Sequence, residues 1–292
     1  MKNSFTEVLN KLSKANNNKN DLMIPHNSIP NPIEKDNESM NEDVCFVSKN
    51  KIGIADGAGG VGIFCKDWAS YLLNKTPEYS FNSKAEIPIW YNKIREDFYN
   101  EIQKKTKEYD DFVIDKFEKE GSFSTLSIVW IVEDELKVFS IGDSGVFCFK
   151  KTDENDYKLV ALKPYIFYDD INSSPYLLNW NQEITSHYDY FYLKREDVDL
   201  IIIASDSISR FIIQCIYGIN KNDLSGFINE KFISTISELN NEKFNYTSYN
   251  ALIDKIMQLS NLDDSNFKKA MIQMVEDDVL EPDDFSLIFH TL

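Results

Sequence analysis

The chain has 292 residues, and its 31 lysines and arginines stand against 48 aspartates and glutamates, which gives a formal net charge of −17. Such a charge repels nucleic-acid phosphates and anionic lipid headgroups, so we expect no nucleic-acid partner and no membrane partner. Hydrophobic residues make up 42% of the chain and aromatic residues 13%, which is enough for a sizeable core and excludes wholesale disorder.

The N-terminal part predicts a short arm and a loop. Residues 4–15 carry apolar side chains at helical spacing, and we assign 1–20 to a helical arm and 21–292 to a single domain. Residues 16–42 are rich in Asn, Pro and Ser and predict an extended loop. The start has no apolar signal core, and no apolar run reaches the roughly 18–20 residues of a membrane span, so we expect a cytoplasmic protein.

Beyond this loop the pattern predicts a β-rich domain interrupted by helices. In chain order we expect strands near 44–48 and 52–55, helices over 64–75 and 88–119, and strands at 124–132, 135–141, 145–151 and 156–162. Short strands with tight connections favour antiparallel pairing. The rest of the chain predicts an irregular segment over 164–189, a fully buried strand at 199–204, several helices over 207–276 and a final strand at 285–292. This order predicts an α+β fold.

Glycine and cysteine are both informative. Five of the ten glycines lie within one ten-residue window, and Asp56 directly precedes four of them: Gly57, Gly59, Gly60 and Gly62. Glycine lets the main chain approach a ligand closely, so we interpret this segment as a binding loop rather than a plain tight turn. The four cysteines have no CxxC spacing and lie among apolar residues, which predicts buried free thiols in a reducing compartment.

Acidic residues stand at the ends of several predicted strands. Three hydrophobic strands run into Asp56, Asp143 and Asp206, and acidic pairs precede two more, at Glu42–Asp43 and Asp283–Asp284. Carboxylates gathered from neighbouring strand ends would repel one another unless a cation lay between them, and all-oxygen ligands suit Mg²⁺ or Mn²⁺. A single aspartate is more often a turn or cap residue, but the whole set beside a glycine cluster favours a metal site.

Two such ions can activate a water and clamp a phosphate during in-line hydrolysis. No competing catalytic motif is present, because the chain contains neither a GxSxG elbow nor a P-loop. The three histidines, His26, His187 and His290, lie far apart in sequence. The residues therefore favour metal-dependent hydrolysis over a serine hydrolase or a nucleotide switch.

Six segments in order resemble the metal-dependent protein phosphatase family PP2C (PPM): NEDVCFV, IADGAGG, GSFSTLSIVWI, IGDSG, IIIASD and DDFSLIF. The resemblance extends from about residue 41 to 292. An Ile-Pro-His segment before Glu42, GDSG in place of GDSR, and SSPYLL at 173–178 are similar to the branch typified by mitochondrial and plastid members.

The resemblance implies an α/β/β/α sandwich, two packed antiparallel sheets flanked by helices. It also implies a protein serine/threonine phosphatase, a phosphoric monoester hydrolase that uses two or three Mn²⁺ or Mg²⁺ ions. The matched positions imply that Asp56 bridges two metals and that the Gly57 carbonyl ligates one. They further imply metal-ligand roles for Asp206, Asp283, Glu42, Asp43 and, at a weaker third ion, Asp143. Asp56, Glu42 and Asp43 would be the catalytic set, with Asp284 in support.

Two features depart from the family. Glu38 stands about where the family places a phosphate-binding arginine, and the three arginines (Arg95, Arg195, Arg210) are distant from it in sequence. We therefore leave the substrate-binding residue unknown, with Lys35 or Lys51 as candidates. Residues 207–276 exceed the usual helix and loop, and we interpret them as a helical insertion that caps the site or binds a protein partner.

Three hypotheses follow from the sequence. The first is a phosphatase that acts on phosphoserine or phosphothreonine in a phosphorylated protein substrate. The second is a catalytically weak or silent PP2C-like domain that serves as a binding or regulatory module, which the missing arginine favours. The third is an acidic scaffold whose aspartates only cap strands, and it predicts no Mn²⁺ binding.

Overall fold

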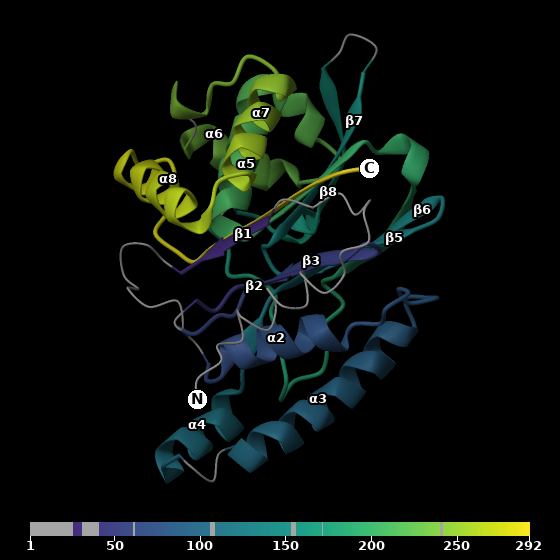
Figure 1. Cartoon of the computed structure of the whole chain (residues 1–292), viewed down its shortest axis with the longest axis vertical. Helices are drawn as coiled ribbons and strands as arrows, with labels where there is room; N and C mark the ends of the chain where they lie inside the picture. Colours follow the sequence, from purple (N-terminus) through teal and green to yellow (C-terminus); the bar gives the residue numbers. More distant parts are fainter. Residues whose placement is uncertain are drawn as a thin grey trace.

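Two five-stranded antiparallel sheets pack face to face at the centre of the molecule (Figure 1). The first has the order β1-β12-β11-β7-β8, with bounds His26–Ile29, Phe285–Thr291, Leu200–Ala204, Gly145–Lys151 and Tyr157–Lys163. The second has the order β10-β6-β5-β3-β2, with bounds Asp189–Lys194, Glu135–Ile141, Leu126–Val132, Lys51–Ala55 and Val44–Val47. A two-stranded pair joins β4 (Phe123–Ser124) to β9 (Leu178–Asn179).

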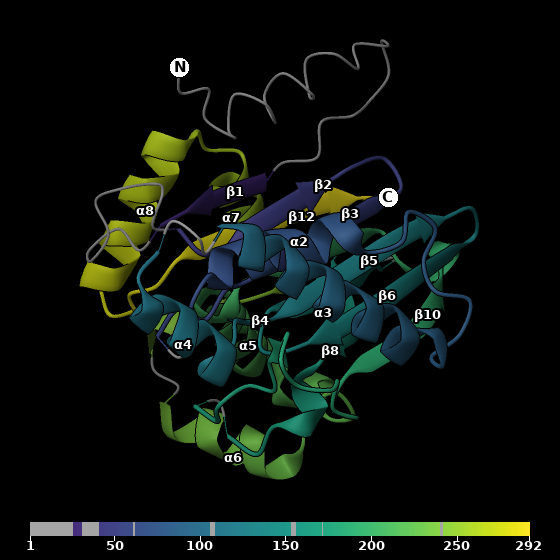
Figure 2. The same cartoon turned by 90° about the horizontal axis from the view of Figure 1, so that it is seen from below.

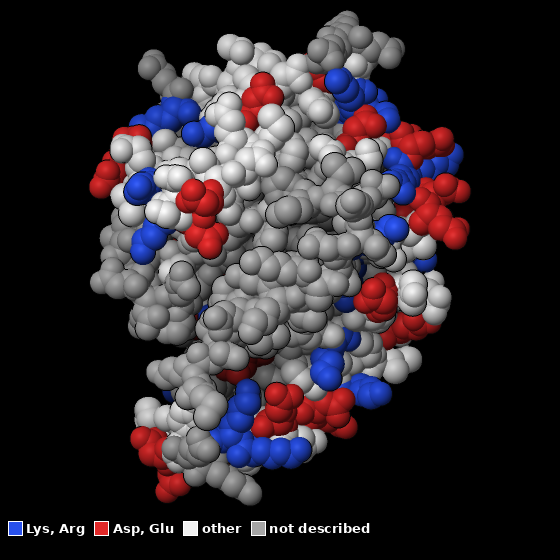
Figure 3. Space-filling view, in the orientation of Figure 1, with Lys and Arg blue, Asp and Glu red and all other residues white. Residues whose placement is uncertain are grey.

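This computed structural model describes residues 26–30, 41–60, 62–105, 109–152, 156–170, 172–239 and 242–292. The predicted helix over 4–15, the arm over 1–20, Lys35 and Glu38 lie outside the described residues. No described helix combines the length and apolar character needed to cross a membrane. On the face in Figure 3, the described basic side chains are interspersed with acidic ones rather than gathered in one patch.

Aliphatic side chains from both sheets fill the space between them. β3 and β11 bury every residue, as expected for strands covered on both faces. Ile52 and Ile54 of β3 belong to the same buried cluster as Ile201 and Ile203 of β11. These contacts hold the two sheets together and fix the relative positions of their strand ends.

Helices cover the outer face of each sheet and complete four layers (Figure 1), and in Figure 2 the helices over the second sheet lie in front of its strands. On the second sheet lie α2, α3 and α4, with bounds Cys65–Lys75, Glu86–Lys105 and Asp111–Glu120. On the first lie α5, α6, α7 and α8, with bounds Asp206–Asn220, Glu230–Leu239, Tyr249–Ser260 and Asp264–Glu276. Short 3₁₀ helices occupy Tyr165–Phe167, Arg195–Asp197, Lys221–Leu224 and Glu242–Phe244. The α+β sandwich predicted from the sequence is confirmed.

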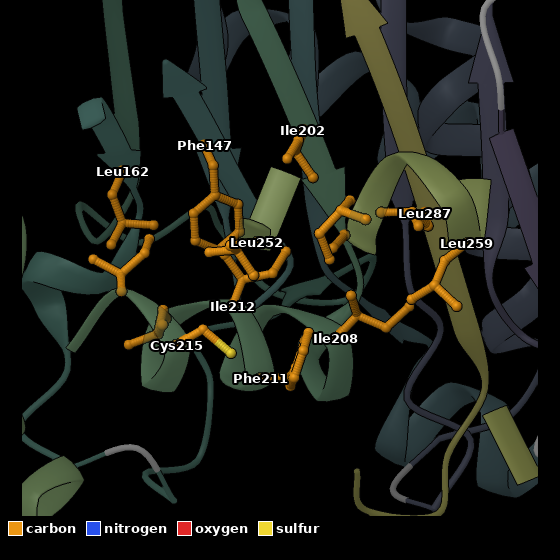
Figure 4. Packing of buried hydrophobic residues seen from close by; sticks show 14 of the residues in the cluster. Phe147, Leu162, Ile202, Ile208, Phe211, Ile212, Cys215, Leu252, Leu259 and Leu287 are labelled. Carbon is orange, nitrogen blue, oxygen red and sulfur yellow. The ribbon is translucent and has the colours of Figure 1, made fainter. Parts of the chain in front are cut away.

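Helix α5 shows how the sequence anchors this layer. Ile208, Phe211, Ile212 and Cys215 recur at helical spacing and are buried. Figure 4 shows them in the same cluster as sheet residues such as Ile202. Burial of a large aliphatic side chain contributes about 1.5–3 kcal/mol, so this stripe fixes both the position and the rotation of the helix.

Three features differ from the sequence prediction or refine it. Residues 26–29, expected in a loop, form β1 and pair with β12. The single helix expected over 88–119 is two helices, because Asp110 starts α4 by accepting a hydrogen bond from the Val113 amide at 3.0 Å. The helical region 207–276 consists mainly of α5 to α8 and forms the outer layer of the first sheet. All four cysteines are free thiols, as predicted, and three are buried.

Candidate active site

The strand register brings the predicted acidic segments to one edge of the sandwich. In the second sheet Val44 pairs with Ala55, so the segment before β2 lies beside the segment after β3. In the first sheet Ala204 pairs with both Leu287 and Gly145, so the end of β11 lies between the starts of β12 and β7. Acidic residues that are far apart in sequence therefore meet where both sheets end.

A cavity of about 540 Å³ opens at this edge. Six of its lining residues are acidic: Glu42, Asp56, Asp143, Asp206, Asp283 and Asp284. The glycine segment from Gly57 to Gly60, Thr125, Pro175 and Leu177 contribute further walls. Among the described residues, Arg210 is the only basic residue in this lining. The structure thus gathers into one pocket every predicted metal ligand except Asp43, which lies buried behind it.

Asp56 directly follows β3, and hydrogen bonds from its backbone to Thr125 fix its position. Its amide donates to Thr125 Oγ1 at 3.0 Å, and its carbonyl accepts from the Thr125 amide at 2.8 Å. Thr125 Oγ1 also lies 2.7 Å from Ser144 Oγ. Burial, and then the charges of Asp43 and Asp206, hold the pKa of the Asp56 carboxyl well above its usual range. A metal-free pocket therefore disfavours the charged form of Asp56.

Asp43 has the least satisfied carboxylate of the group. It is 4% exposed, and among the described residues neither carboxylate oxygen has a partner in good hydrogen-bonding geometry, although the Asp56 carboxyl and the Ser286 hydroxyl lie near enough to lower its pKa in part. Burial, followed by the charge of Asp284, raises the pKa of Asp43 well above its usual value. A buried carboxylate without a donor or a countercharge is costly, so this residue needs a proton or a nearby cation.

Glu42 is held between the glycine segment and the segment before β12. Its amide donates to Asp284 Oδ2 at 2.7 Å, and the Gly59 amide donates to Glu42 Oε2 at 3.2 Å. A Cβ atom at residue 59 would lie 2.1 Å from the Glu42 carboxylate oxygens, so only glycine permits this approach. The Gly57 carbonyl, a predicted ligand, faces the same loop and accepts from the Gly59 amide at 3.1 Å.

Asp143 lies in the connection between β6 and β7, which two tyrosines fix. The Tyr165 hydroxyl donates to the Asp143 carbonyl, and the Tyr168 hydroxyl donates to the Gly142 carbonyl at 2.8 Å. Gly142 has a φ of 97°, a conformation that favours glycine. Burial raises the pKa of the Asp143 carboxyl to about 6, although the guanidinium of Arg210 opposes this rise.

Asp206 is the first residue of α5, and its surroundings combine repulsion with attraction. Burial, and then the charge of Asp143, raises the pKa of the Asp206 carboxyl to about 7. Arg210, one helical turn later, places Nη2 3.7 Å from Asp206 Oδ2 and 3.9 Å from Asp143 Oδ2. The Ser207 hydroxyl donates to the Glu281 carbonyl at 2.9 Å and ties α5 to the segment before β12.

The donor chemistry of the pocket fits a hard divalent cation. Its acidic residues offer only oxygen atoms as metal ligands. The buried Asp43 carboxylate also has no hydrogen-bond partner in good geometry among the described residues. Within the described ranges, however, no three Asp, Glu, His or Cys side chains converge as the ligands of one ion. Ligation would therefore require the carboxylates to move closer together than they stand here.

One candidate for phosphate binding lies outside the pocket, whereas a basic residue with no predicted role lines it. Lys51, a candidate for phosphate binding, is buried at the far end of β3, where Nζ donates to the Thr76 carbonyl at 3.2 Å. Arg210, by contrast, is distant from Glu38 in sequence yet lines the pocket. Its i+4 spacing from Asp206 was the available signal, because residues four apart share one face of a helix.

Comparison with known proteins identifies the fold. No protein-family model and no curated protein sequence matches the chain. A bacterial serine phosphatase aligns with a TM-score of 0.50 and 12% identity over 92% of this chain and 98% of that one. Stp1 from Staphylococcus aureus, a serine/threonine phosphatase, aligns with a TM-score of 0.49 and 11% identity over 93% and 96%. The catalytic domain of PstP, in complex with two manganese ions, aligns with a TM-score of 0.48 and 12% identity over 91% and 96%.

These likenesses bear on the fold and on the predicted branch. The bacterial serine phosphatase and this chain share the fold of two antiparallel sheets flanked by helices. The serine phosphatase that aligns with a TM-score of 0.50 is bacterial, and the comparison gives no support to the predicted closeness to mitochondrial and plastid members.

Proposed function

We propose that this chain hydrolyses phosphoserine and phosphothreonine in proteins and that its acidic pocket works with bound Mn²⁺ or Mg²⁺. The observation that carries the proposal is that six acidic residues, from the strand ends of both sheets, line one pocket. The serine phosphatase fold supports it. The free thiols are consistent with action in the reducing cytoplasm.

The residues divide the work by position. The charges of Asp43, Asp206, Asp143 and Asp283 all raise the pKa of the Asp56 carboxyl, and we assign Asp56 as a ligand that could serve either ion. Glu42, Asp43 and the Gly57 carbonyl would hold the ion nearer the second sheet, whereas Asp206 and Asp283 would hold the one nearer the first.

When bound, two such ions supply a water of lowered pKa and stabilise the charge of a phosphoryl group under attack. The chain itself places the ligands at neighbouring strand ends and keeps the ligand set acidic. Thr125 fixes the Asp56 backbone, and Asp284 fixes the Glu42 backbone. No nucleophilic side chain is required for this chemistry.

The proposal is tested by hydrolysis of p-nitrophenyl phosphate and of a phosphoserine peptide by metal-stripped protein, before and after addition of Mn²⁺ or Mg²⁺. We expect turnover only with metal, and its loss on chelation. Asp56→Asn, which keeps the side-chain shape and removes the charge, should remain folded and inactive. Turnover that survives exhaustive chelation would overturn the proposal.

A second candidate function is a PP2C-like module that binds phosphoproteins with little or no turnover. The observation that favours it is the position of Arg210, whose cationic group lies within 4 Å of two predicted metal ligands, Asp143 and Asp206. Such a module would bind a phosphopeptide without releasing phosphate in the presence of Mn²⁺. A protein partner at α5 to α8 belongs to this hypothesis as well.

A further inference from the structure

Arg210 lines the acidic pocket, and the family resemblance in the sequence gives it no role there. Its Nη2 atom lies 3.7 Å from Asp206 Oδ2 and 3.9 Å from Asp143 Oδ2, and these carboxylates come from different segments. Its Nη1 atom donates to Glu281 Oε2 at 2.6 Å. The guanidinium is therefore placed between two pocket carboxylates and tied on its other side.

Burial and backbone position make this placement a built feature. The side chains of Arg210, Asp143 and Asp206 are only 18%, 14% and 15% exposed. Arg210 lies on α5, a helix with many buried residues, four residues after Asp206. Residues four apart share one face of a helix, so α5 presents both side chains to the pocket. The turn that carries Asp143 is fixed separately by the Tyr165 hydroxyl. Neither partner depends on a mobile surface contact.

A guanidinium stays charged at any physiological pH, and it neutralises carboxylates without dissociating. A divalent ion that used Asp143 and Asp206 together would have to enter beside this fixed positive charge and would be repelled by it. We propose that Arg210 is a resident cation that takes the place of a metal ion at the Asp143–Asp206 side of the pocket. The ions of the proposed site would then bind without Asp143, at Glu42, Asp43 and Asp56 and at Asp206 and Asp283.

This inference rests on the proposed function only in taking the pocket to bind divalent ions, and it is tested without measuring turnover. The full chain is stripped of metal, and the number and affinity of bound Mn²⁺ ions are measured by equilibrium dialysis and electron paramagnetic resonance. The central variant is Arg210→Gln, which keeps a polar side chain and removes the charge. Arg210→Ala is the second neutral variant, in case one of the two fails to fold.

We expect each folded neutral variant to bind one more Mn²⁺ ion per chain than the wild type. Arg210→Lys, which retains a positive charge, should not gain the ion. The gain should also vanish in Arg210→Gln/Asp143→Asn, because the added ion needs that carboxylate. Arg95→Ala is the matched arginine control, since Arg95 lies on α3 and donates to the Trp180 carbonyl away from the pocket.

The outcomes separate the inference from the proposed function. If the wild type binds Mn²⁺ and turns over phosphoester, but neither neutral variant gains an ion, the role of Arg210 is wrong and the phosphatase proposal stands. If the wild type neither binds Mn²⁺ nor turns over, while the neutral variants bind an ion, Arg210 is the resident cation and the phosphatase proposal fails. An equal gain in Arg210→Lys would overturn the inference, because charge would then not be the cause.

Discussion

Removing one carboxylate from the metal-free pocket should stabilise the protein, and Asp206→Asn is the sharpest test. Burial and the charge of Asp143 raise the pKa of the Asp206 carboxyl from 3.8 to about 7. Between these values the folded state holds a proton that the unfolded state has lost, so stability falls as pH rises through this window. Above about pH 7 the folded state carries the Asp206 charge, and the full free-energy cost of burying that charge remains. Asparagine carries no such charge and retains Oδ1 as the acceptor for the Ser207 amide.

The magnitude follows from the size of the shift. Each pKa unit corresponds to a little over 1 kcal/mol, so Asp206→Asn should stabilise the metal-free protein by roughly 4 kcal/mol near pH 8 and by less than half of that near pH 5. For a chain of this size the larger value corresponds to a rise in Tm of roughly 5–10 °C. Mn²⁺ should reverse the order, because the wild type alone retains the full ligand set.

The assay is thermal unfolding in a chelator at the two pH values, followed by addition of Mn²⁺. Asp254→Asn is the matched control, since Asp254 lies exposed on α7 and should leave Tm nearly unchanged at both pH values. A lower Tm for Asp206→Asn near pH 8 without metal, or an equal gain at both pH values, would refute the argument that burial of charge destabilises the empty pocket.

Two further predictions concern ligation and loop geometry. Asp56→Ala should abolish measurable metal-dependent turnover. Asp284 accepts from the Glu42 amide, so Asp284→Ala should lower kcat/KM by about 10–100-fold. Equal losses of activity in the two folded variants would contradict this ranking. Gly59→Ala should weaken Mn²⁺ binding about 10-fold, because the added Cβ would lie 2.1 Å from the Glu42 carboxylate oxygens. Gly60→Ala is the control, since its Cβ would meet nothing within 4 Å, and its Mn²⁺ affinity should match that of the wild type. Equilibrium dialysis measures both affinities.

Local patterns in the sequence predict most of the sandwich and the positions of its acids. β3 and β11 are recognisable because strands covered on both faces need continuous apolar runs, and each ends directly before a pocket residue. β1 was not predictable in the same way. It has only four residues, HNSI, and depends on pairing with β12, more than 250 residues later in the chain. Strand propensity is weak information for so short and polar a segment.

The role of Arg210 could not be predicted for a different physical reason. Its i+4 relation to Asp206 was visible, but its second partner, Asp143, comes from another segment. That contact depends on the rotation of α5, which is set by packing of Ile208 and Ile212 on the first sheet. Rotation of a helix against a sheet is a property of the assembled core, so a search for an arginine near Glu38 in sequence missed the one near the pocket in space.

Lys51 illustrates the converse, a residue near the glycine segment in sequence but not in space. It begins β3, and at roughly 3.3 Å per residue it lies about 16 Å from Asp56 at the other end. Its ammonium is 4.6 Å from the centroid of the Phe46 ring, and it donates to the Thr76 carbonyl and to Thr76 Oγ1 at 3.2 and 3.3 Å. We therefore expect Lys51 to stabilise the strand rather than to bind substrate.

Lys51→Met shortens the side chain by one heavy atom and removes both hydrogen bonds and the charge. The buried Thr76 carbonyl then loses this donor, whereas Thr76 Oγ1 still donates to the Leu73 carbonyl. Loss of a buried hydrogen bond costs about 1–3 kcal/mol, so Tm should fall while KM for a phosphopeptide stays at the wild-type value. Lys49→Met, at an exposed position two residues earlier, should change neither quantity. Thermal unfolding and steady-state kinetics on the same samples separate the two roles, and a raised KM with an unchanged Tm would return Lys51 to the phosphate-binding site.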